Sequence, residues 1–291
     1  MYISGFTFVR NAIQFDYPIV EAITSILPLC DEVVVAVGKS EDDTLGLIQS
    51  IDSPKIRIIK TVWDDSLREG GRVLAEETNK AFAAISPEAD WAFYIQGDEV
   101  IHEKYHEVIR NAMHFYGDKS EIQGLLFKYL HFYGSYDYIG ISRRWYSQEI
   151  RIIRNDKSIR SYRDAQGFRR DNNKLQVARI PAYVYHYGWV KHPSLQQAKQ
   201  RNFHKMWHDD QWMAEKIPDV SEFDYSNIDL LKKFEGTHPQ LMQKRITAMN
   251  WKFDFDPTKA QWTVKSRLLF WWEKLTGRRP FAYRNYKIKQ L

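Results

Sequence analysis

The sequence has few of the features that stabilise secreted proteins and none that mark a membrane-spanning one. Cys30 is the single cysteine, so no intramolecular disulfide and no CxxC metal site can form. No apolar run reaches the roughly 18 residues of a transmembrane helix. The segment Met1–Phe15 is too polar for a secretory signal. We therefore expect a soluble, cytoplasmic protein that folds around an ordinary hydrophobic core.

Two nucleotide-binding motifs are also absent. There is no GxxxxGK[ST] segment, which excludes a P-loop, and no GxGxxG after the first predicted strand, which excludes a dinucleotide-binding fingerprint. The chain has 291 residues, of which 44% are hydrophobic and 27% charged, as in ordinary globular proteins. Aromatic residues make up 15%. Such side chains often line sugar sites, although packing in a core is their commoner role.

The positive charge is concentrated at the end of the chain. Residues 251–291 carry ten Lys and Arg against three Asp and Glu, whereas residues 1–250 have a net charge of −2. A nucleic-acid-binding protein would show a basic face within the folded body. We therefore expect no nucleic-acid partner.

The first hundred residues alternate between strand and helix patterns. Strands are expected at Ile3–Val9, Glu32–Val37, Lys55–Val62 and Trp91–Ile95, and helices at Asp16–Leu27, Asp43–Ser50 and Gly71–Ile85. This rhythm predicts an α/β fold with a parallel sheet and right-handed crossovers. Ligands of such sheets bind beyond the carboxyl ends of the strands.

The rest of the chain indicates a mixed continuation of the sheet followed by helices. Further strands are expected at Ile122–Phe132, Glu149–Arg154 and Ala182–His186, and further helices at Asp209–Lys216, Asn227–Phe234 and Pro239–Met249. We see no internal repeat and no low-complexity linker. The helices are therefore expected to pack onto the sheet domain.

Two acidic residues follow the apolar strand Trp91–Ile95 directly. Asp98 and Glu99 are expected to face the ligand crevice, where two carboxylates repel each other unless a cation lies between them. Mg²⁺ and Mn²⁺ prefer oxygen ligands and bind through one or two carboxylates plus substrate phosphates. The alternative is that both residues begin a solvated loop and cap a helix near His102.

Two further signals are weaker. His186 ends an alternating strand before Gly188, and it is either a metal ligand, for which a neutral imidazole suits Mn²⁺, or a structural histidine. Gly70, Gly71 and Arg72 form either a phosphate-binding loop or a simple turn.

The order of these segments resembles that of family 2 glycosyltransferases. A first strand ending in Arg10–Asn11, the EVVVAVGKSEDDT segment, Asn79 and the ADWAFYIQGDEVI block carry the resemblance, which covers roughly residues 1–190. It implies the GT-A fold, a central mixed, mostly parallel sheet flanked by helices. We accordingly expect a catalytic domain over residues 1–192 and a helical, basic C-terminal extension over residues 193–291.

The resemblance also implies a function. It predicts an inverting glycosyltransferase that uses a UDP- or GDP-type sugar donor, Mn²⁺ or Mg²⁺, and a glycan or lipid-linked acceptor in envelope or glycoconjugate synthesis. Asp98 matches the last Asp of the DxD motif and would bind the metal, and His186, 88 residues later, would complete the metal shell. The implied donor-binding residues are Arg10, Asn11, Asp42, Arg72, Asn79, Gln96 and Gly97.

The chain departs from the family pattern at two places. Gln96 stands where the first Asp of DxD is found, and Val37 stands where an Asp commonly ends the second strand, with Asp42 and Asp43 following. These departures favour a second hypothesis, a non-catalytic nucleotide-sugar-binding protein of the same fold.

Inverting transfer needs a carboxylate that takes the proton of the acceptor hydroxyl. In the family this residue lies between the DxD motif and the histidine. Asp164 is the first candidate, and Asp171 and Glu149 are alternatives. Each of the three is otherwise a surface or ion-paired carboxylate among many arginines.

An apolar stripe with helical spacing lies in the basic tail. It consists of Val264, Leu268, Trp271, Trp272 and Leu275, and the nearby lysines and arginines fall largely off it. One interpretation is a terminal helix that packs this stripe onto the sheet domain. The other is an interfacial helix that places the protein peripherally on an anionic membrane, at its inner face.

Overall fold

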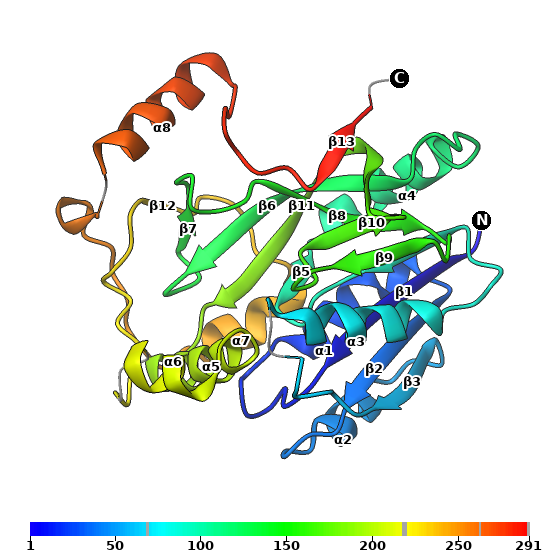
Figure 1. Ribbon diagram of the computed structural model, residues 1–291, viewed down its shortest axis with the longest axis horizontal. Helices are drawn as coiled ribbons and strands as arrows, with labels where there is room; N and C mark the ends of the chain where they lie inside the picture. Colours follow the sequence, from blue (N-terminus) through cyan, green and yellow to red (C-terminus); the bar gives the residue numbers. More distant parts are fainter. Residues whose placement is uncertain (68–69, 217–219, 262, 290–291) are drawn as a thin grey trace.

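The computed structural model describes residues 1–67, 70–216, 220–261 and 263–289. Its main sheet runs in the order β3-β2-β1-β4-β8-β6-β11, as Figure 1 shows. Six of these seven strands point the same way, and β8 alone is antiparallel to its neighbours. The strands are β1 (Ile3–Val9), β2 (Glu32–Gly38), β3 (Ile56–Thr61), β4 (Trp91–Tyr94), β6 (Gly124–Tyr133), β8 (Gln148–Arg154) and β11 (Asn173–Trp189). The expected mixed, mostly parallel α/β fold is confirmed.

Helices cover both faces of this sheet. One face packs on α1 (Ile19–Ile26) and α4 (His106–Phe115), and the other packs on α3 (Arg72–Ala83). The short α2 (Thr44–Gln49) begins at Asp43, whose side chain accepts a hydrogen bond from the Gly46 amide, as an N-cap residue does. The first helix begins later than expected: Pro18 is its N-cap, and Asp16 instead accepts a hydrogen bond from Arg245.

Short strands extend the middle of the sheet. A β9–β10 hairpin (Ile159–Tyr162 and Gly167–Arg170) joins the sheet beside β11, and β5 (Glu99–Ile101) pairs antiparallel with β11 so that Glu99 faces His186. The strand expected at Ala182–His186 is thus the end of the much longer β11. Two 3₁₀ turns, η1 (Leu27–Leu29) and η2 (Glu103–Tyr105), precede β2 and α4 respectively.

The segment after Trp189 is mostly helical but also adds two strands. Its helices are α5 (Pro193–Lys205), α6 (Asp210–Lys216), α7 (Gln243–Thr247) and α8 (Val264–Thr276), with 3₁₀ turns η3 (Gln240–Met242) and η4 (Pro257–Lys259). The helix expected over Asn227–Phe234 is wrong, because β12 (Leu231–Lys233) pairs there with β7 (Tyr138–Gly140). The available edge of β7 supplies backbone partners that outweigh local helix preference. Farther on, β13 (Tyr286–Ile288) runs parallel to β11.

The last helix lies apart from the sheet at the edge of the molecule, as Figure 1 shows. The five apolar side chains of its predicted stripe are 55–84% exposed, so the stripe does not pack on the sheet domain. Among the described residues, no helix has the length and apolar character needed to cross a membrane.

Candidate active site

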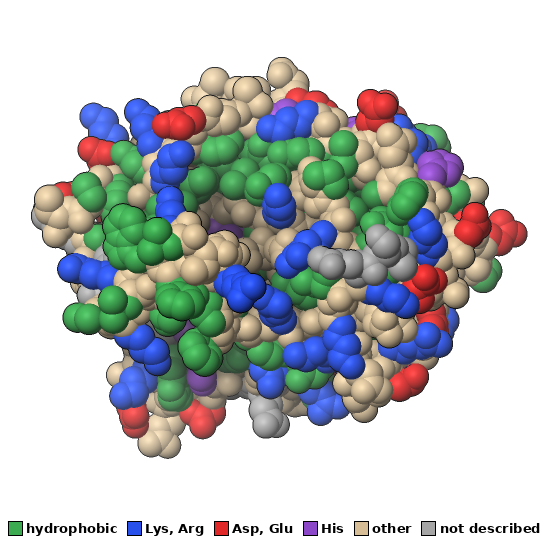
Figure 2. All heavy atoms as spheres, turned by 90° about the horizontal axis from the view of Figure 1, so that it is seen from above, with side chains coloured by type: hydrophobic (Ala, Val, Ile, Leu, Met, Phe, Trp, Pro, Cys, Tyr) green, Lys and Arg blue, Asp and Glu red, His purple; other side chains and the backbone are tan. Residues whose placement is uncertain are grey.

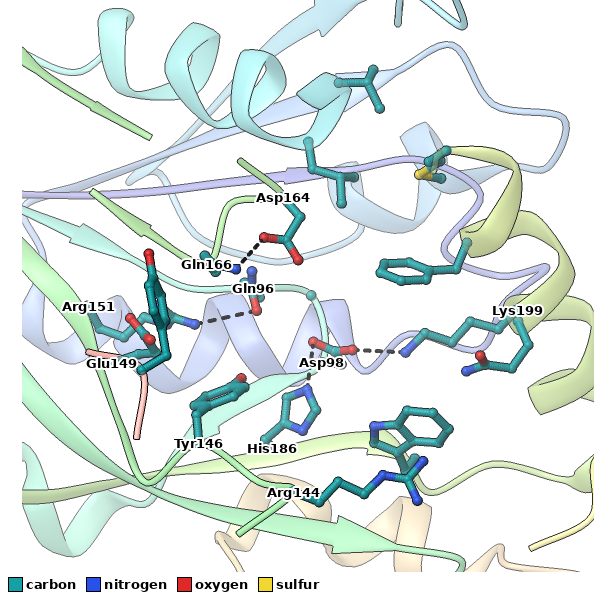
Figure 3. A pocket seen from close by; sticks show the side chains of 18 of the residues that line it. Gln96, Asp98, Arg144, Tyr146, Glu149, Arg151, Asp164, Gln166, His186 and Lys199 are labelled. Atoms are coloured by element: carbon teal, nitrogen blue, oxygen red, sulfur yellow. Dashed lines mark hydrogen bonds and ion pairs between the residues drawn. The ribbon is translucent and has the colours of Figure 1, made fainter. Parts of the chain in front are cut away.

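A pocket of about 1210 Å³ lies beyond the carboxyl ends of the first four strands. The loops after β1, β3 and β4 supply one side of it, and β8, β11 and α5 supply the other. Figure 3 shows Gln96, Asp98, Glu149, Asp164, His186 and Lys199 around the same space. The strands of a parallel sheet bring their ends to one edge, so residues far apart in sequence meet here.

Asp98 is held between a lysine and a histidine. Its Oδ2 accepts a hydrogen bond of 3.0 Å from Lys199 Nζ, and its Oδ1 lies 3.7 Å from His186 Nε2. Burial raises the pKa of Asp98, but the charge and hydrogen bond of Lys199, with a smaller contribution from His186, lower it well below its ordinary value. Asp98 is therefore a carboxylate throughout the physiological pH range.

The expectation that Glu99 faces the pocket is wrong. It is fully buried, and both of its oxygens accept hydrogen bonds from Arg151, at 2.6 Å from Nη2 and 2.8 Å from Nε. The Tyr129 hydroxyl and the backbone amide of Gln96 also donate to Glu99. No cation between Asp98 and Glu99 is needed, because Arg151 already neutralises Glu99 inside the fold.

Gln96 lines the pocket but is tied to the same buried network. Its side-chain oxygen accepts from Arg151 at 3.4 Å, and its side-chain nitrogen lies 3.4 Å from the Tyr94 hydroxyl and from the Ala165 carbonyl. This uncharged side chain therefore adds no negative charge to the pocket.

His186 is a neutral imidazole in this setting. Burial lowers its pKa, and the charge of Asp98 only partly offsets that effect. Its Nδ1 lies 3.2 Å from Nδ1 of His131, whose pKa burial lowers even further. At neutral pH the pair therefore shares a single hydrogen bond between two uncharged rings.

The side chains present do not form a metal site from protein ligands alone. Among the residues that the structure describes, no group of three or more His, Cys, Asp or Glu side chains could hold one. Asp98 and His186 converge, but Lys199 already takes one carboxylate oxygen, and Glu99 is sealed by Arg151. The implied Mn²⁺ or Mg²⁺ would find at most two protein ligands, Asp98 and His186. The ammonium group of Lys199 lies directly beside them.

The three candidate bases lie in different places. Asp164 and Glu149 line the pocket, whereas Asp171 lies exposed in the turn between β10 and β11. Burial raises the pKa of Asp164, and a hydrogen bond of 3.0 Å from Gln166 opposes the shift. Burial raises the pKa of Glu149 to about 8, and its Oε2 has no hydrogen-bond partner among the described residues.

Asp164 lies close to the start of α3. The Gly71 N-cap has a left-handed backbone with φ of 68°, and an added Cβ there would come within 2.7 Å of the Asp164 Cβ. A side chain at position 71 would therefore displace the candidate base as well as strain the turn. This steric requirement explains the glycine without any bound phosphate.

The implied donor-binding residues divide into two groups. Arg10, Asn11, Gln96 and Gly97 line the pocket. The structure does not bring the other three into it: Asp42 accepts hydrogen bonds from the amides of Gln14 and Thr44, Asn79 accepts one from the Ser161 amide, and Arg72 is exposed. Asp42 and Asn79 thus fix loops and strand ends around the site.

Sequence reasoning missed the cations of the far wall. Lys199 comes from α5, and Arg143, Arg144, Arg179 and Arg279 also line the pocket. Arg143 and Arg279 both contact Glu273 of α8, at 2.9 and 3.4 Å, which brings the basic tail to the pocket rim. The cluster of arginines after residue 143 was visible in the sequence, but no local pattern singled out Lys199.

No protein-family model matches the sequence, and no curated protein matches it. Among solved structures, the chain is similar to TarS from S. aureus, with a TM-score of 0.40, 17% identity, and coverage of 70% of this chain and 39% of that one. TarS 1–349 in complex with UDP gives the same TM-score and identity and is covered to 64%. The chain thus spans less than two thirds of these structures.

A second group of similar structures is glucosyl-3-phosphoglycerate synthase from Mycobacterium tuberculosis. Its complex with Mn²⁺, UDP-glucose and phosphoglyceric acid has a TM-score of 0.30 and 20% identity, and covers 45% of this chain and 43% of that one. These solved structures are GT-A-type glycosyltransferases. At such scores and identities the matches by themselves assign no activity to this chain.

Proposed function

We propose that this protein is a glycosyltransferase that moves a sugar from a nucleoside-diphosphate sugar to a hydroxyl acceptor, with inversion at the anomeric carbon. The observation that supports it is a single pocket holding two kinds of group. One is a cationic wall that suits a diphosphate, and the other is a half-buried carboxylate, Asp164, with a raised pKa that suits proton abstraction.

The donor would lie along the strand ends. Arg10 and Asn11 follow β1, and the Arg10 guanidinium lies 5.5 Å from the ring centre of Trp63, which follows β3. This flat, partly cationic surface suits a nucleobase and its ribose. The diphosphate would then reach the loop at Gln96–Asp98 and the cations behind it. Direct binding measurements with UDP and GDP decide which nucleobase the site takes.

Of the two candidate bases that line the pocket, Asp164 is the better one. With a pKa of about 8, Glu149 is mostly protonated at neutral pH and is a proton donor rather than an acceptor. In the proposed step, Asp164 takes the acceptor's hydroxyl proton and the hydroxyl oxygen bonds to the anomeric carbon. The bond from that carbon to the diphosphate oxygen breaks, and the nucleoside diphosphate leaves with the electron pair.

The test is a donor screen that measures released nucleoside diphosphate, with and without Mn²⁺ and with a panel of acceptors. Asp164→Asn should lower turnover by roughly 10²–10⁴-fold, the usual contribution of a general base. Asp171→Asn is the matched control, because Asp171 lies in an exposed turn outside the pocket. Full turnover in Asp164→Asn together with loss in Glu149→Gln would transfer the role to Glu149.

The second candidate is a nucleotide-sugar-binding protein without catalysis. The observation that favours it is Gln96, which leaves the loop with one carboxylate facing the pocket. Isothermal titration with UDP and GDP separates the two functions when it is paired with the release assay. Tight binding with no turnover on any donor or acceptor would support the binding protein.

The proposal also includes a peripheral membrane location for the protein, where it would meet a lipid-linked acceptor. On α8 the stripe residues Trp271 and Trp272 are 62% and 55% exposed, and Lys265, Arg267 and Lys274 flank the stripe on both sides. Figure 2, which views the face carrying α8, shows hydrophobic side chains interspersed with Lys and Arg. Exposed indoles with flanking cations match an anionic bilayer surface. Glu273 faces the other way, toward Arg143 at the pocket rim.

Co-sedimentation with phosphatidylglycerol vesicles tests this location. The full chain should sediment with the vesicles, and the Trp271→Ser, Trp272→Ser double variant should not. Phe115→Ser is the control, because Phe115 is a similarly exposed aromatic (61%) on α4. Absence of sedimentation for the full chain, or equal sedimentation of all three proteins, would contradict a membrane role for α8.

A further inference from the structure

We infer that Lys199 supplies, from within the protein, the positive charge that holds the donor's diphosphate and stabilises it as it leaves, in place of a divalent cation. This inference rests on the proposed function. It follows from the contacts of Lys199, from the charge balance around Asp98, and from the ion pair that holds Glu99 away from the pocket.

Lys199 is fixed at the pocket wall by two contacts. Its Nζ donates to Asp98 Oδ2 at 3.0 Å and to the Gly188 carbonyl at 2.9 Å, and it lies 5.0 Å from the ring centre of Tyr17. Figure 3 shows the side chain reaching from its helix directly to Asp98. An ammonium group has three N–H donors. Two point at the protein, and the third is available to an oxygen atom in the pocket.

Lys199 is only 12% exposed, but its Nζ lies 3.0 Å from the carboxylate of Asp98, which pairs with an ammonium group at this position. The buried Lys191 nearby behaves differently, because burial and the charge of Lys199 lower its pKa to about 7. Lys191 also donates to the Asp16 carbonyl and does not line the pocket. The fixed cation of this wall is therefore Lys199.

The charges balance without a metal. Two carboxylates and one divalent cation sum to zero. Here Gln96 is neutral, and Asp98 with Lys199 also sums to zero. Relative to that arrangement, the amide and the lysine each add one positive charge, and together they make up for the two charges of the cation. The arginines of the far wall then give the pocket its excess positive charge.

Several of the possible ligand atoms are already engaged. Glu99 accepts two hydrogen bonds from Arg151, and His186 contacts His131 through Nδ1. Asp98 Oδ2 accepts from Lys199, so Asp98 Oδ1 and His186 Nε2, 3.7 Å apart, are left beside an ammonium group. Asp98 consequently acts on the substrate through Lys199, which it orients. Lys199 itself is the group placed to touch the diphosphate, which it would hold by charge-assisted hydrogen bonds.

The test measures binding of UDP and GDP by isothermal titration, once with EDTA and once with Mn²⁺. The wild type should bind its nucleotide with similar affinity in both buffers. Lys199→Met should lose roughly tenfold or more in affinity in both, the usual effect of removing a charged hydrogen bond. Lys199→Arg should keep part of the affinity. Lys232→Met is the charge-matched control, since Lys232 pairs with Glu235 on the surface.

Two results separate failure of this inference from failure of the proposed function. Wild-type binding or turnover that requires Mn²⁺, with Lys199→Met unaffected, would overturn the role of Lys199 and leave the glycosyltransferase intact. Folded wild type that binds no nucleoside diphosphate and turns over no donor in either buffer would overturn both. If Lys199→Met fails to fold, the EDTA insensitivity of the wild type and the behaviour of Lys199→Arg still decide the question.

Discussion

Asp98 and Glu99 are neighbours in the chain and carry the same charge, yet they serve different ends. Each is paired with one cation, Lys199 or Arg151. The Glu99–Arg151 pair is sealed, with exposures of 0% and 1%, whereas the Asp98–Lys199 pair lines the pocket with exposures of 14% and 12%. Consecutive side chains near a strand point to opposite faces, so one carboxylate meets the interior and the other meets the ligand. The comparison teaches that the sealed pair supports the fold and the open pair supports binding.

The largest expected effect comes from breaking the sealed pair. Arg151→Met should lower the free energy of unfolding by roughly 3–5 kcal/mol, because it leaves the Glu99 charge buried and uncompensated. Urea unfolding followed by circular dichroism measures the change. A loss below about 1 kcal/mol would mean that Glu99 becomes protonated or reaches water, and the distinction between the two pairs would fail.

Breaking the open pair should act on binding instead. Asp98→Asn removes the charge that orients Lys199, and we expect a loss of nucleotide affinity and turnover of roughly tenfold or more, with a smaller loss of stability than in Arg151→Met. Titration calorimetry and urea unfolding on the same preparation measure both quantities. Equal stability losses in the two variants, with unchanged affinity in Asp98→Asn, would contradict the comparison.

Glu149 extends the comparison to a carboxylate that has no ion-pair partner within the described part of the chain. Its pKa is about 8 in the folded protein and about 4.5 when unfolded. The folded state therefore binds more protons between these values. The resulting stability is fully present below about pH 4.5 and is lost as pH rises through about 8, by an amount on the order of a few kcal/mol. Unfolding measured from pH 5 to 9 should show this decline, and Glu149→Gln should flatten it. An unchanged slope in the variant would mean that Glu149 titrates normally.

The smallest effect is expected for a pair whose cation is exposed. Arg57 lies 3.1 Å from Glu32, and the two side chains are 46% and 14% exposed. Arg57→Met makes the same chemical change as Arg151→Met, but it should change the unfolding free energy by less than about 1 kcal/mol. A loss as large as that of Arg151→Met would show that burial does not set the difference.

The sequence was sufficient for the strands β1 to β4 and for one acid of the candidate site. The continuous apolar run of β2 and the position of Asp98 directly after β4 led to the parallel sheet and to its ligand edge. The partner of Asp98 was beyond reach, because Lys199 lies 101 residues later on a helix of unremarkable pattern. Likewise, only the packing of β8 beside β4 and β6 shows that Arg151 turns Glu99 inward.

Asp42 and Asn79 illustrate a second limit of the sequence. Asp42 lies in the loop after β2, and Asn79 lies on α3. In the structure each one accepts backbone hydrogen bonds, and the nearby loops depend on them. Asp and Asn side chains readily bind neighbouring backbone amides. Composition and position alone cannot separate this use from ligand binding.

The long strand β11 has a consequence for how the chain reaches its native state. It pairs with β6, about fifty residues earlier, and with β5, about eighty residues earlier, as in Val177 with Gly124 and Val184 with Ile101. The entropy of closing such loops is lost before the pairings stabilise anything, which makes folding slow. Until then the apolar edge of β6 is open to other chains. Refolding yield should therefore fall as protein concentration rises. The contacts of His186, which lies on β11, should form late.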